Sequence, residues 1–179
     1  MMRFERITDV SHPMFAQAMA LYQESFPVHE QREALSQERI LKHPDYHFSL
    51  VYDEALWIGL VLYWEQAEYL YIEHLCIIPT MRNKQYGQHV LTLLAEQSKT
   101  IILEIDPPVD TISIWCKGFY ERCGFTVNVY SHTHPPYHQD CAGHKLVVMT
   151  APQAVSAEMY DAFASYLNQV VMQDAFAKE

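Results

Sequence analysis

One stretch of the chain, residues 75–91, decides the fold, and it reads LCIIPTMRNKQYGQHVL. An apolar, strand-like segment runs up to Pro79, and a short polar turn with two cations, Arg82 and Lys84, follows it. After the turn the apolar period changes from two to about 3.6, which predicts a helix over residues 86–98. The free N–H groups and the positive dipole end of this helix point at the turn. The pattern predicts an anion site suited to a phosphate-bearing ligand, and a plain strand-to-helix connection with solvated cations is the alternative.

The composition excludes several classes of protein. Among 179 residues, 12 Lys and Arg stand against 22 Asp and Glu, which gives a net charge of −10, and half of all residues are hydrophobic. Such a chain buries enough apolar surface to fold, and its acidic balance opposes a platform for nucleic acid. Four cysteines at irregular spacing, with no CxxC pair, are typical of reduced thiols in a cytosolic protein.

No signal peptide or membrane span is expected from the sequence. The first ten residues lack an apolar core, and the longest apolar run, residues 56–64, covers nine positions where a membrane helix needs roughly 20. The sequence therefore predicts a soluble, cytoplasmic protein with no membrane or nucleic-acid partner.

Upstream of residues 75–91 the chain alternates between helical and strand-like periods. A strand is expected over residues 3–9 and helices over 13–26 and 36–42, and the segments 46–53, 55–64 and 69–78 then predict an antiparallel meander.

Downstream, a buried strand over 100–105 precedes a helix over 112–122, which Gly124 closes as the residue after the cap. Strands over 125–130 and 144–149 follow, joined by a His- and Pro-rich loop, and residues 155–176 read as one long amphipathic helix. The expected architecture is α/β.

Two motifs resemble those of a known family. Arg82-Asn83-Lys84-Gln85-Tyr86-Gly87 is similar to the Arg/Gln-x-x-Gly-x-Gly/Ala acyl-CoA signature of the GNAT N-acetyltransferase superfamily, and GFYERCGF, residues 118–125, resembles its Phe-Tyr-x-x-x-Gly-Phe element. One position departs from the signature, because Gln85 stands where the family has its first glycine. Its side chain is expected to crowd a pyrophosphate drawn close to the turn.

The resemblance implies a GNAT-like fold: a mixed, mostly antiparallel central sheet of six to seven strands flanked by helices. It covers residues 1–150 as an acyl-CoA-binding acetyltransferase domain and leaves 151–179 outside. This C-terminal helix is expected to pack on the same domain, to cover the acceptor cleft, or to form a subunit interface in a homodimer.

The implied activity is acetyl-CoA-dependent transfer of an acetyl group to a primary amine of a small molecule or peptide. Direct attack in a ternary complex is expected, because no Cys/His pair is recognisably placed as an activated nucleophile. Acetyl-CoA is the co-substrate and no metal is expected. The residues implied to hold the cofactor are Leu75, Cys76, Ile77, Arg82, Asn83, Lys84, Gln85, Tyr86, Gly87 and Gln88.

Three groups are candidates for the chemistry. Tyr120 matches the family tyrosine that protonates the departing thiolate, and the backbone N–H of Cys76 is the candidate donor to the thioester oxygen. Strand alternation puts Glu73 on one face with Tyr71 and Leu75, and His74 with Ile72 on the other. Glu73 is the candidate base, with His74 as an alternative, and pairing of Glu73 with a cation on a neighbouring strand is the structural alternative.

The candidate acceptor-binding residues are Glu30, Glu104, His134 and Tyr137. Glu30 lies in the segment 26–32, where relatives line the acceptor site, and a plain connector between helices is the alternative for this segment. Glu104 is a carboxylate in a buried strand, where structural pairing and binding of a cationic substrate are both open. The other two belong to the loop 132–144, which has the spacing H-x-H-x3-H-x2-C-x2-H. That spacing matches no structural zinc pattern. Two other functions compete with acetyl transfer. One is non-catalytic binding of acyl-CoA, and the other is a metalloprotein built on this loop.

Overall fold

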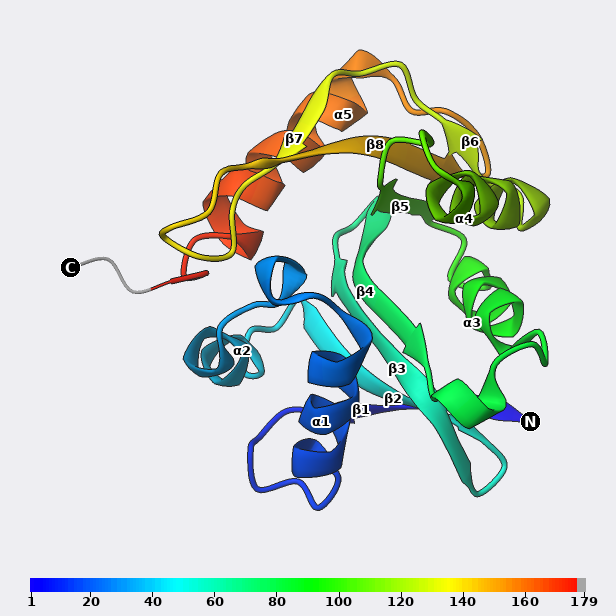
Figure 1. Ribbon diagram of the computed structural model, residues 1–179, viewed down its shortest axis with the longest axis vertical. Coiled ribbons are helices and arrows are strands. Elements are labelled where there is room, and N and C mark those ends of the chain that lie inside the picture. Colours follow the sequence, from blue (N-terminus) through cyan, green and yellow to red (C-terminus); the bar gives the residue numbers. More distant parts are fainter. Residues whose placement is uncertain (177–179) are drawn as a thin grey trace.

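A central sheet of eight strands forms the core of the computed structural model, which describes residues 1–176 (Figure 1). The strands lie in the order β1-β2-β3-β4-β5-β8-β6, and β7 pairs with β8. Their bounds are β1 Met2–Ile7, β2 Tyr46–Asp53, β3 Leu56–Glu65, β4 Tyr69–Ile77, β5 Thr100–Ile105, β6 Thr126–Val127, β7 His132–His134 and β8 His144–Ala151. Only β4 and β5 pair in parallel among the pairs described, so the predicted mixed, mostly antiparallel sheet is confirmed. The one strand beyond the expected six to seven is β7, inside the His-rich loop.

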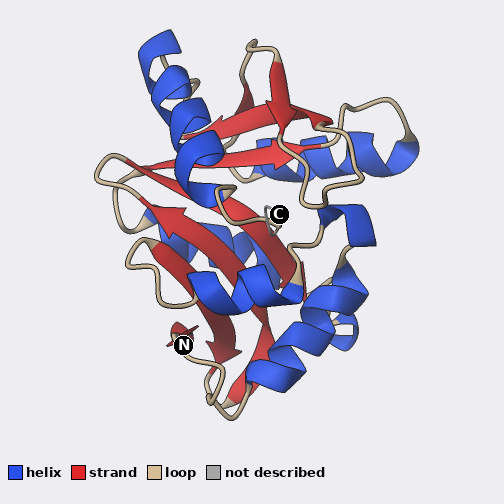
Figure 2. Ribbon diagram, turned by 90° about the vertical axis from the view of Figure 1, so that its left-hand side faces the viewer, coloured by secondary structure: helices blue, strands red, loops and turns tan. Residues whose placement is uncertain are grey.

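Helices cover both faces of this sheet (Figure 2). Their bounds are α1 Phe15–Ser25, η1 Val28–Glu30, α2 Ala34–Ile40, η2 Pro79–Met81, α3 Tyr86–Ala95, α4 Thr111–Arg122, α5 Ala157–Tyr166 and η3 Leu167–Val171. Buried side chains of α1, α2, α5 and η3 share one apolar cluster with one face of the sheet, and those of α3 share a second cluster with the other face, to which α4 contributes partly buried side chains. Among residues 1–176, no helix combines the length and the apolarity needed to cross a membrane.

A β-bulge in β4 changes which side chains share a face. Leu62 on β3 pairs with His74, whereas the next residue, Tyr63, pairs with Ile72, so Glu73 has no partner in this register. One extra residue shifts the alternation of everything after it. The predicted faces are therefore wrong beyond Glu73: His74 packs against the rings of α1, and Leu75 joins the opposite cluster with Ile72.

The parallel pair β4–β5 is short. Only Tyr69, Leu70 and Tyr71 have partners on β5, at Thr100 to Ile102. Beyond this point both strands continue, β4 to Ile77 and β5 to Ile105, without pairing with each other. The two strands thus separate, and within residues 1–176 the part of β4 after the bulge has one edge without a strand partner.

The C-terminal end of α4 has the predicted glycine cap. Gly124 has a φ of +94°, a left-handed conformation that favours glycine, and its N–H donates to the carbonyl of Glu121 at 3.1 Å. The N–H of Phe125 donates to the carbonyl of Tyr120 at 3.0 Å. These two bonds make a Schellman motif and fix the last turn of α4, which carries Tyr120.

Several element ends differ from those predicted. The helix expected over 36–42 begins two residues earlier and ends at Ile40. The strand expected over 125–130 is assigned only at Thr126–Val127. The N–H of Asn128 still donates to the carbonyl of Val148, and its side chain bonds to the hydroxyl of Thr150 and to the N–H of Val155.

The C-terminal segment is not the single long helix that was predicted. α5 gives way to a π-helical turn, η3, and turns follow up to residue 176. The carbonyl of Val171, at the end of η3, accepts a bond from the side chain of Arg32 at 2.8 Å, which satisfies this terminal carbonyl. Residues 177–179, the end of the segment 151–179, lie outside the described part.

Candidate active site

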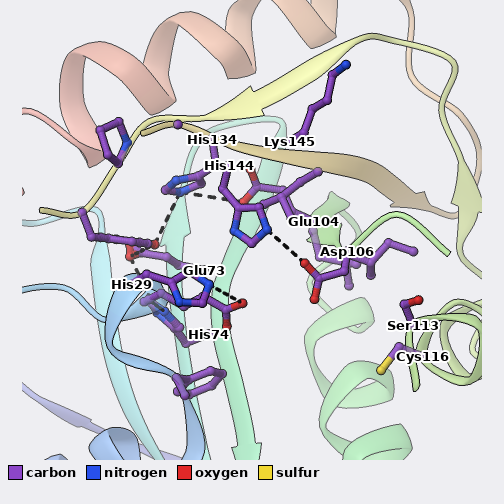
Figure 3. A pocket seen from close by; sticks show the side chains of 18 of the residues that line it. His29, Glu73, His74, Glu104, Asp106, Ser113, Cys116, His134, His144 and Lys145 are labelled. Atoms are coloured by element: carbon purple, nitrogen blue, oxygen red, sulfur yellow. Dashed lines mark hydrogen bonds and ion pairs between the residues drawn. The ribbon is translucent and has the colours of Figure 1, made fainter. Parts of the chain in front are cut away.

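A cavity of about 720 Å³ opens where β4 and β5 separate (Figure 3). Its walls come from both strands, from η1, from α4 and from the segment 134–146. Six of the predicted side chains meet there, and they are Glu30, Glu73, Glu104, Tyr120, His134 and Tyr137. The structure thus brings the predicted catalytic and acceptor-binding residues into one space, whereas residues 82–88 lie outside it, on the β4–α3 connection and the first turn of α3.

Tyr120 reaches this cavity from the last turns of α4. Its side chain is half-buried and packs edge-on against Phe119 and Phe125. Removal from water raises the pKa of the Tyr120 phenol above its ordinary value. The group therefore remains a proton donor throughout the neutral range.

Glu73, the bulge residue, lies at the cavity wall in a buried ion pair. Both carboxylate oxygens accept from the Nη2 atom of Arg32, at 3.1 and 3.2 Å, and further donors are the indole of Trp64 and the hydroxyl of Tyr137. Burial opposes the charge of Glu73, but the Arg32 guanidinium outweighs it and holds the pKa of the carboxyl below its ordinary value. An ionised carboxylate with its acceptors engaged is a weak proton acceptor but a strong fixed negative charge.

His74 is held in its neutral form beside this pair. Its Nε2 atom lies 2.8 Å from the carbonyl of Glu30, which can only accept, so Nε2 carries the proton. Burial lowers the pKa of His74, and its Nδ1 atom is buried without a hydrogen-bond partner among the described residues. The acceptor atom of His74 is therefore closed off from the cavity.

Glu104 anchors a second polar cluster on β5. Its carboxylate accepts from the hydroxyl of Tyr71 and lies 2.6 Å from Nε2 of His132. Burial opposes its charge, but His134 and His132 together hold the pKa of Glu104 below its ordinary value. His134 turns its Nδ1–H to the carbonyl of Pro135 at 2.6 Å, which leaves Nε2 as an acceptor 3.4 Å from the hydroxyl of Tyr137.

The backbone N–H of Cys76 does not face the cavity, contrary to the prediction. Ile78, two residues further on, donates its N–H to Ile58 of β3, and the Cys76 carbonyl lies against Gly59 of the same strand. Because alternate residues turn their N–H groups to the same edge, the N–H of Cys76 also faces β3. The groups on the open edge belong to Leu75 and Ile77, and Leu75 lines the cavity.

The thiols near the site are in their protonated forms. Burial raises the pKa of the Cys76 thiol to about 11, and it also raises the pKa of Cys116 on the cavity wall. A nucleophilic cysteine needs the thiolate, which these surroundings disfavour.

The β4–α3 connection is built around two left-handed residues. Asn83 has a φ of +63° and Gln85, the cap of α3, has a φ of +64°. The Nε atom of Arg82 donates to the carbonyl of Ile77 at 3.2 Å, which folds the exposed turn back on the end of β4. The Gln85 side chain is exposed and makes no capping bond, so the first N–H groups of α3 are left for a ligand.

A family comparison accounts for this arrangement. The model of the acetyltransferase (GNAT) family matches residues 13–125. The chain belongs to the GNAT family. Comparison with curated protein sequences gives no match.

Solved structures of GNAT proteins share the fold. A GNAT-family protein from Bacteroides thetaiotaomicron is 29% identical, with a TM-score of 0.88 over 95% of this chain and 98% of its own. An acetyltransferase from Bacillus subtilis, solved in complex with CoA, is 12% identical, with a TM-score of 0.55 over 84% and 97%. A chimera of the spermidine N-acetyltransferase SpeG from Vibrio cholerae with hSSAT is 14% identical, with a TM-score of 0.60 over 83% and 93%.

The backbone explains why the GNAT signature has glycine where this chain has Gln85. A left-handed conformation costs a residue with a side chain roughly 1–2 kcal/mol more than glycine. We expect Gln85→Gly to raise the free energy of unfolding by about 1 kcal/mol, measured by urea denaturation. Gln88→Gly, inside α3, is the matched control and should lower it by a similar amount. If Gln85→Gly and Gln88→Gly lower the free energy of unfolding equally, the explanation that Gln85 is strained at the cap of α3 is wrong.

Sequence reasoning missed Arg32, Trp64 and His132 as members of the site. Each is buried and bonded to one of the two carboxylates. Arg32 lies within the segment 26–32 that was expected near the acceptor site, but nothing in its surroundings links it to Glu73, 41 positions away.

Proposed function

We propose that this GNAT protein is an acetyl-CoA-dependent N-acetyltransferase that acts on a primary amine of a cationic small molecule or peptide, by direct attack in a ternary complex. The observation that carries the proposal is the cavity between β4 and β5, which joins Tyr120 to a wall of carboxylates. The acidic residues of its lining are Glu30, Glu73, Glu104, Asp106 and Asp110. Among the described lining residues, Lys145 is the one lysine, and no arginine is present. A cavity lined by this many carboxylates attracts an ammonium group.

The cofactor is proposed to lie along the open edge of β4, with its pyrophosphate at the N-terminus of α3. Free N–H groups in the first turn of α3 and the cations Arg82 and Lys84 suit phosphate oxygens. The open edge of β4 then offers the N–H of Leu75, in place of Cys76, to the thioester oxygen.

The transfer is a single displacement. Glu73 is proposed to attract the ammonium form of the acceptor by its negative charge, and the ammonium first gives one proton to Nε2 of His134, the acceptor atom left by the Nδ1–H bond to Pro135. The neutral amine nitrogen then attacks the thioester carbon, the carbon–sulfur bond breaks, and the sulfur takes a proton from the Tyr120 phenol. The second proton of the attacking nitrogen restores the Tyr120 phenol, and His134 releases its proton to solvent. The raised pKa values of Cys76 and Cys116 support a route without an acyl-enzyme.

A screen of amines with acetyl-CoA, followed by release of the CoA thiol, tests the proposal. We expect diamines and other polycations to react with a kcat/KM at least about tenfold above that of monoamines of equal size that carry no second charge. One favourable ion pair with the second ammonium group supplies a difference of this size. Calorimetry with CoA alone, on the same preparation, measures cofactor binding independently. Binding of CoA with no thiol release across all amines would instead establish a non-catalytic acyl-CoA-binding protein.

A further inference from the structure

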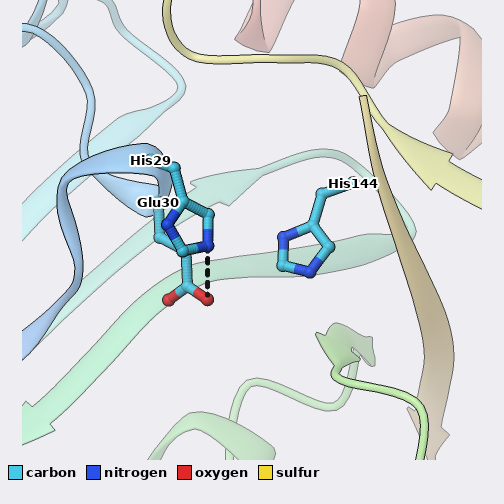
Figure 4. Close-up of side chains that lie close together, drawn as sticks. All are labelled: His29, Glu30 and His144. Atoms are coloured by element: carbon cyan, nitrogen blue, oxygen red, sulfur yellow. Dashed lines mark ion pairs between the residues drawn. The ribbon is translucent and has the colours of Figure 1, made fainter. Parts of the chain in front are cut away.

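Three potential metal ligands from distant parts of the chain meet at the rim of the cavity (Figure 4). They are His29 and Glu30 of η1 and His144 at the start of β8, and their ligand atoms all lie within 4.8 Å of one another. The Nε2 atom of His29 is 3.7 Å from a Glu30 oxygen, and the rings of His29 and His144 are 5.5 Å apart between centroids. Metal ligands around one zinc ion are closer together than this, so partly exposed side chains would have to rotate inward slightly.

A second observation points to the same use of His144. Its Nε2 atom lies 3.1 Å from a carboxylate oxygen of Asp106, the residue that follows β5 (Figure 3). An imidazole that donates one N–H to a carboxylate presents its other nitrogen as a lone pair, which is the usual arrangement of a metal-binding histidine. A carboxylate this close to Nε2 favours the tautomer of His144 with its proton on Nε2, which leaves Nδ1 as the lone pair that a metal needs.

The segment that carries His144 is tied to η1. In the same loop, His138 lies with Nε2 at 2.8 Å from the carbonyl of Val28, one residue before His29, and with Nδ1 at 3.4 Å from Glu33. The bond from His138 to Val28 holds the two sides of the rim together before any ion arrives, which lowers the cost of closing the site.

The local charge also favours a cation. Two carboxylates of the cavity lining, Glu30 and Asp106, lie beside the imidazoles of His29 and His144. A divalent cation placed among these groups is attracted by both negative charges.

We propose that His29, Glu30 and His144 form a zinc site at the rim of the cavity, with Asp106 orienting His144. Two imidazoles and one carboxylate are a zinc ligand set that leaves the fourth position to water or to an incoming ligand. Because an acceptor amine must pass this rim, bound zinc inhibits transfer by competing with the acceptor, a consequence that rests on the proposed function.

Calorimetric titration of the untagged protein with zinc chloride, without CoA or amine, tests the site. We expect one ion per chain, about tenfold weaker binding in Asp106→Asn, and about 100-fold weaker binding in His144→Ala. Zinc should raise the melting temperature of the wild type but not of His144→Ala, which separates loss of the site from loss of the fold. His89→Ala, on the exposed surface of α3, and Cys141→Ser, in the same loop as His144, are the matched controls and should bind as the wild type does.

Equal binding by the wild type and His144→Ala, or loss of binding in Cys141→Ser, overturns the site. In an enzyme that shows transfer, zinc should raise the apparent KM for the acceptor in the wild type and leave the KM of His144→Ala unchanged. If zinc binds at His144 but the apparent KM for the acceptor does not change, the proposed competition between zinc and the acceptor is refuted. A protein that binds zinc as expected and transfers nothing refutes the proposed function and leaves the zinc site standing.

Discussion

Replacement of Tyr120 with phenylalanine is expected to lower kcat for acetyl transfer about 100-fold, the lower end of the range for loss of a general acid. The phenol lies on the cavity wall, and its raised pKa keeps the proton available at neutral pH. The KM for acetyl-CoA should stay within about twofold, because the lost interaction forms only as the thiolate leaves. Steady-state kinetics of thiol release measure both quantities.

The control for Tyr120→Phe is Tyr52→Phe, which removes a hydroxyl from β2, on a residue that packs with Arg3 outside the cavity. It should transfer at the wild-type rate. The role of Tyr120 would be refuted by a kcat that is unchanged in Tyr120→Phe, with CoA binding intact by calorimetry.

Replacement of Arg32 with methionine is expected to cost about 3–5 kcal/mol of unfolding free energy, because it leaves the buried Glu73 carboxylate without its counter-ion. The side chains of both partners are almost fully buried, with exposures of 0% and 1%. The guanidinium also bonds Ser36 and the Val171 carbonyl, so these partners are lost too. Urea denaturation followed by circular dichroism measures the loss.

The loss in Arg32→Met should depend on pH. In the wild type the folded-state pKa of Glu73 is lowered, so the stability from its pair is present above the unfolded pKa and disappears only as pH falls through the lower folded value. Without Arg32, burial dominates and raises the pKa of Glu73 in the folded state. The variant therefore loses stability as pH rises from the unfolded value, and we expect a larger deficit at pH 7.5 than at pH 5.

The double variant Arg32→Met with Glu73→Leu separates the pair from other effects of Arg32. Removal of both charges should recover most of the loss, because no uncompensated charge stays buried. A deficit of equal size in the single and double variants, at both pH values, would contradict the ion-pair explanation.

Local signals in the sequence predicted the frame of the site well. The break at Pro79 and the cations after it located the end of β4 and the start of α3 within a residue, and Gly124 located the end of α4. These are short-range effects of backbone geometry, and they need no knowledge of distant partners.

The remaining features of the site depend on contacts between residues far apart in the chain, and such contacts cannot be inferred from a single sequence. The bulge at Glu73 exists because of the register between β3 and β4, and strict alternation therefore misplaced His74 and Leu75. In the same way, Arg32 gave no sign that it neutralises Glu73. In the sequence the His-rich loop forms one continuous cluster of possible ligands. In the structure its histidines have separate partners: His132 contacts Glu104, His138 contacts the carbonyl of Val28, and His144 contacts Asp106.

The bond from Arg32 to the carbonyl of Val171 has a consequence for synthesis of the protein. The two residues are 139 positions apart, and η3 is the last helical element described. A ribosome makes the chain from the N-terminus, so Arg32, Ser36 and Glu73 emerge long before Val171 does. The bonds around the buried Arg32–Glu73 pair are therefore completed only after η3 has been made, and a nascent chain that stops before η3 carries the GNAT motifs without the finished site.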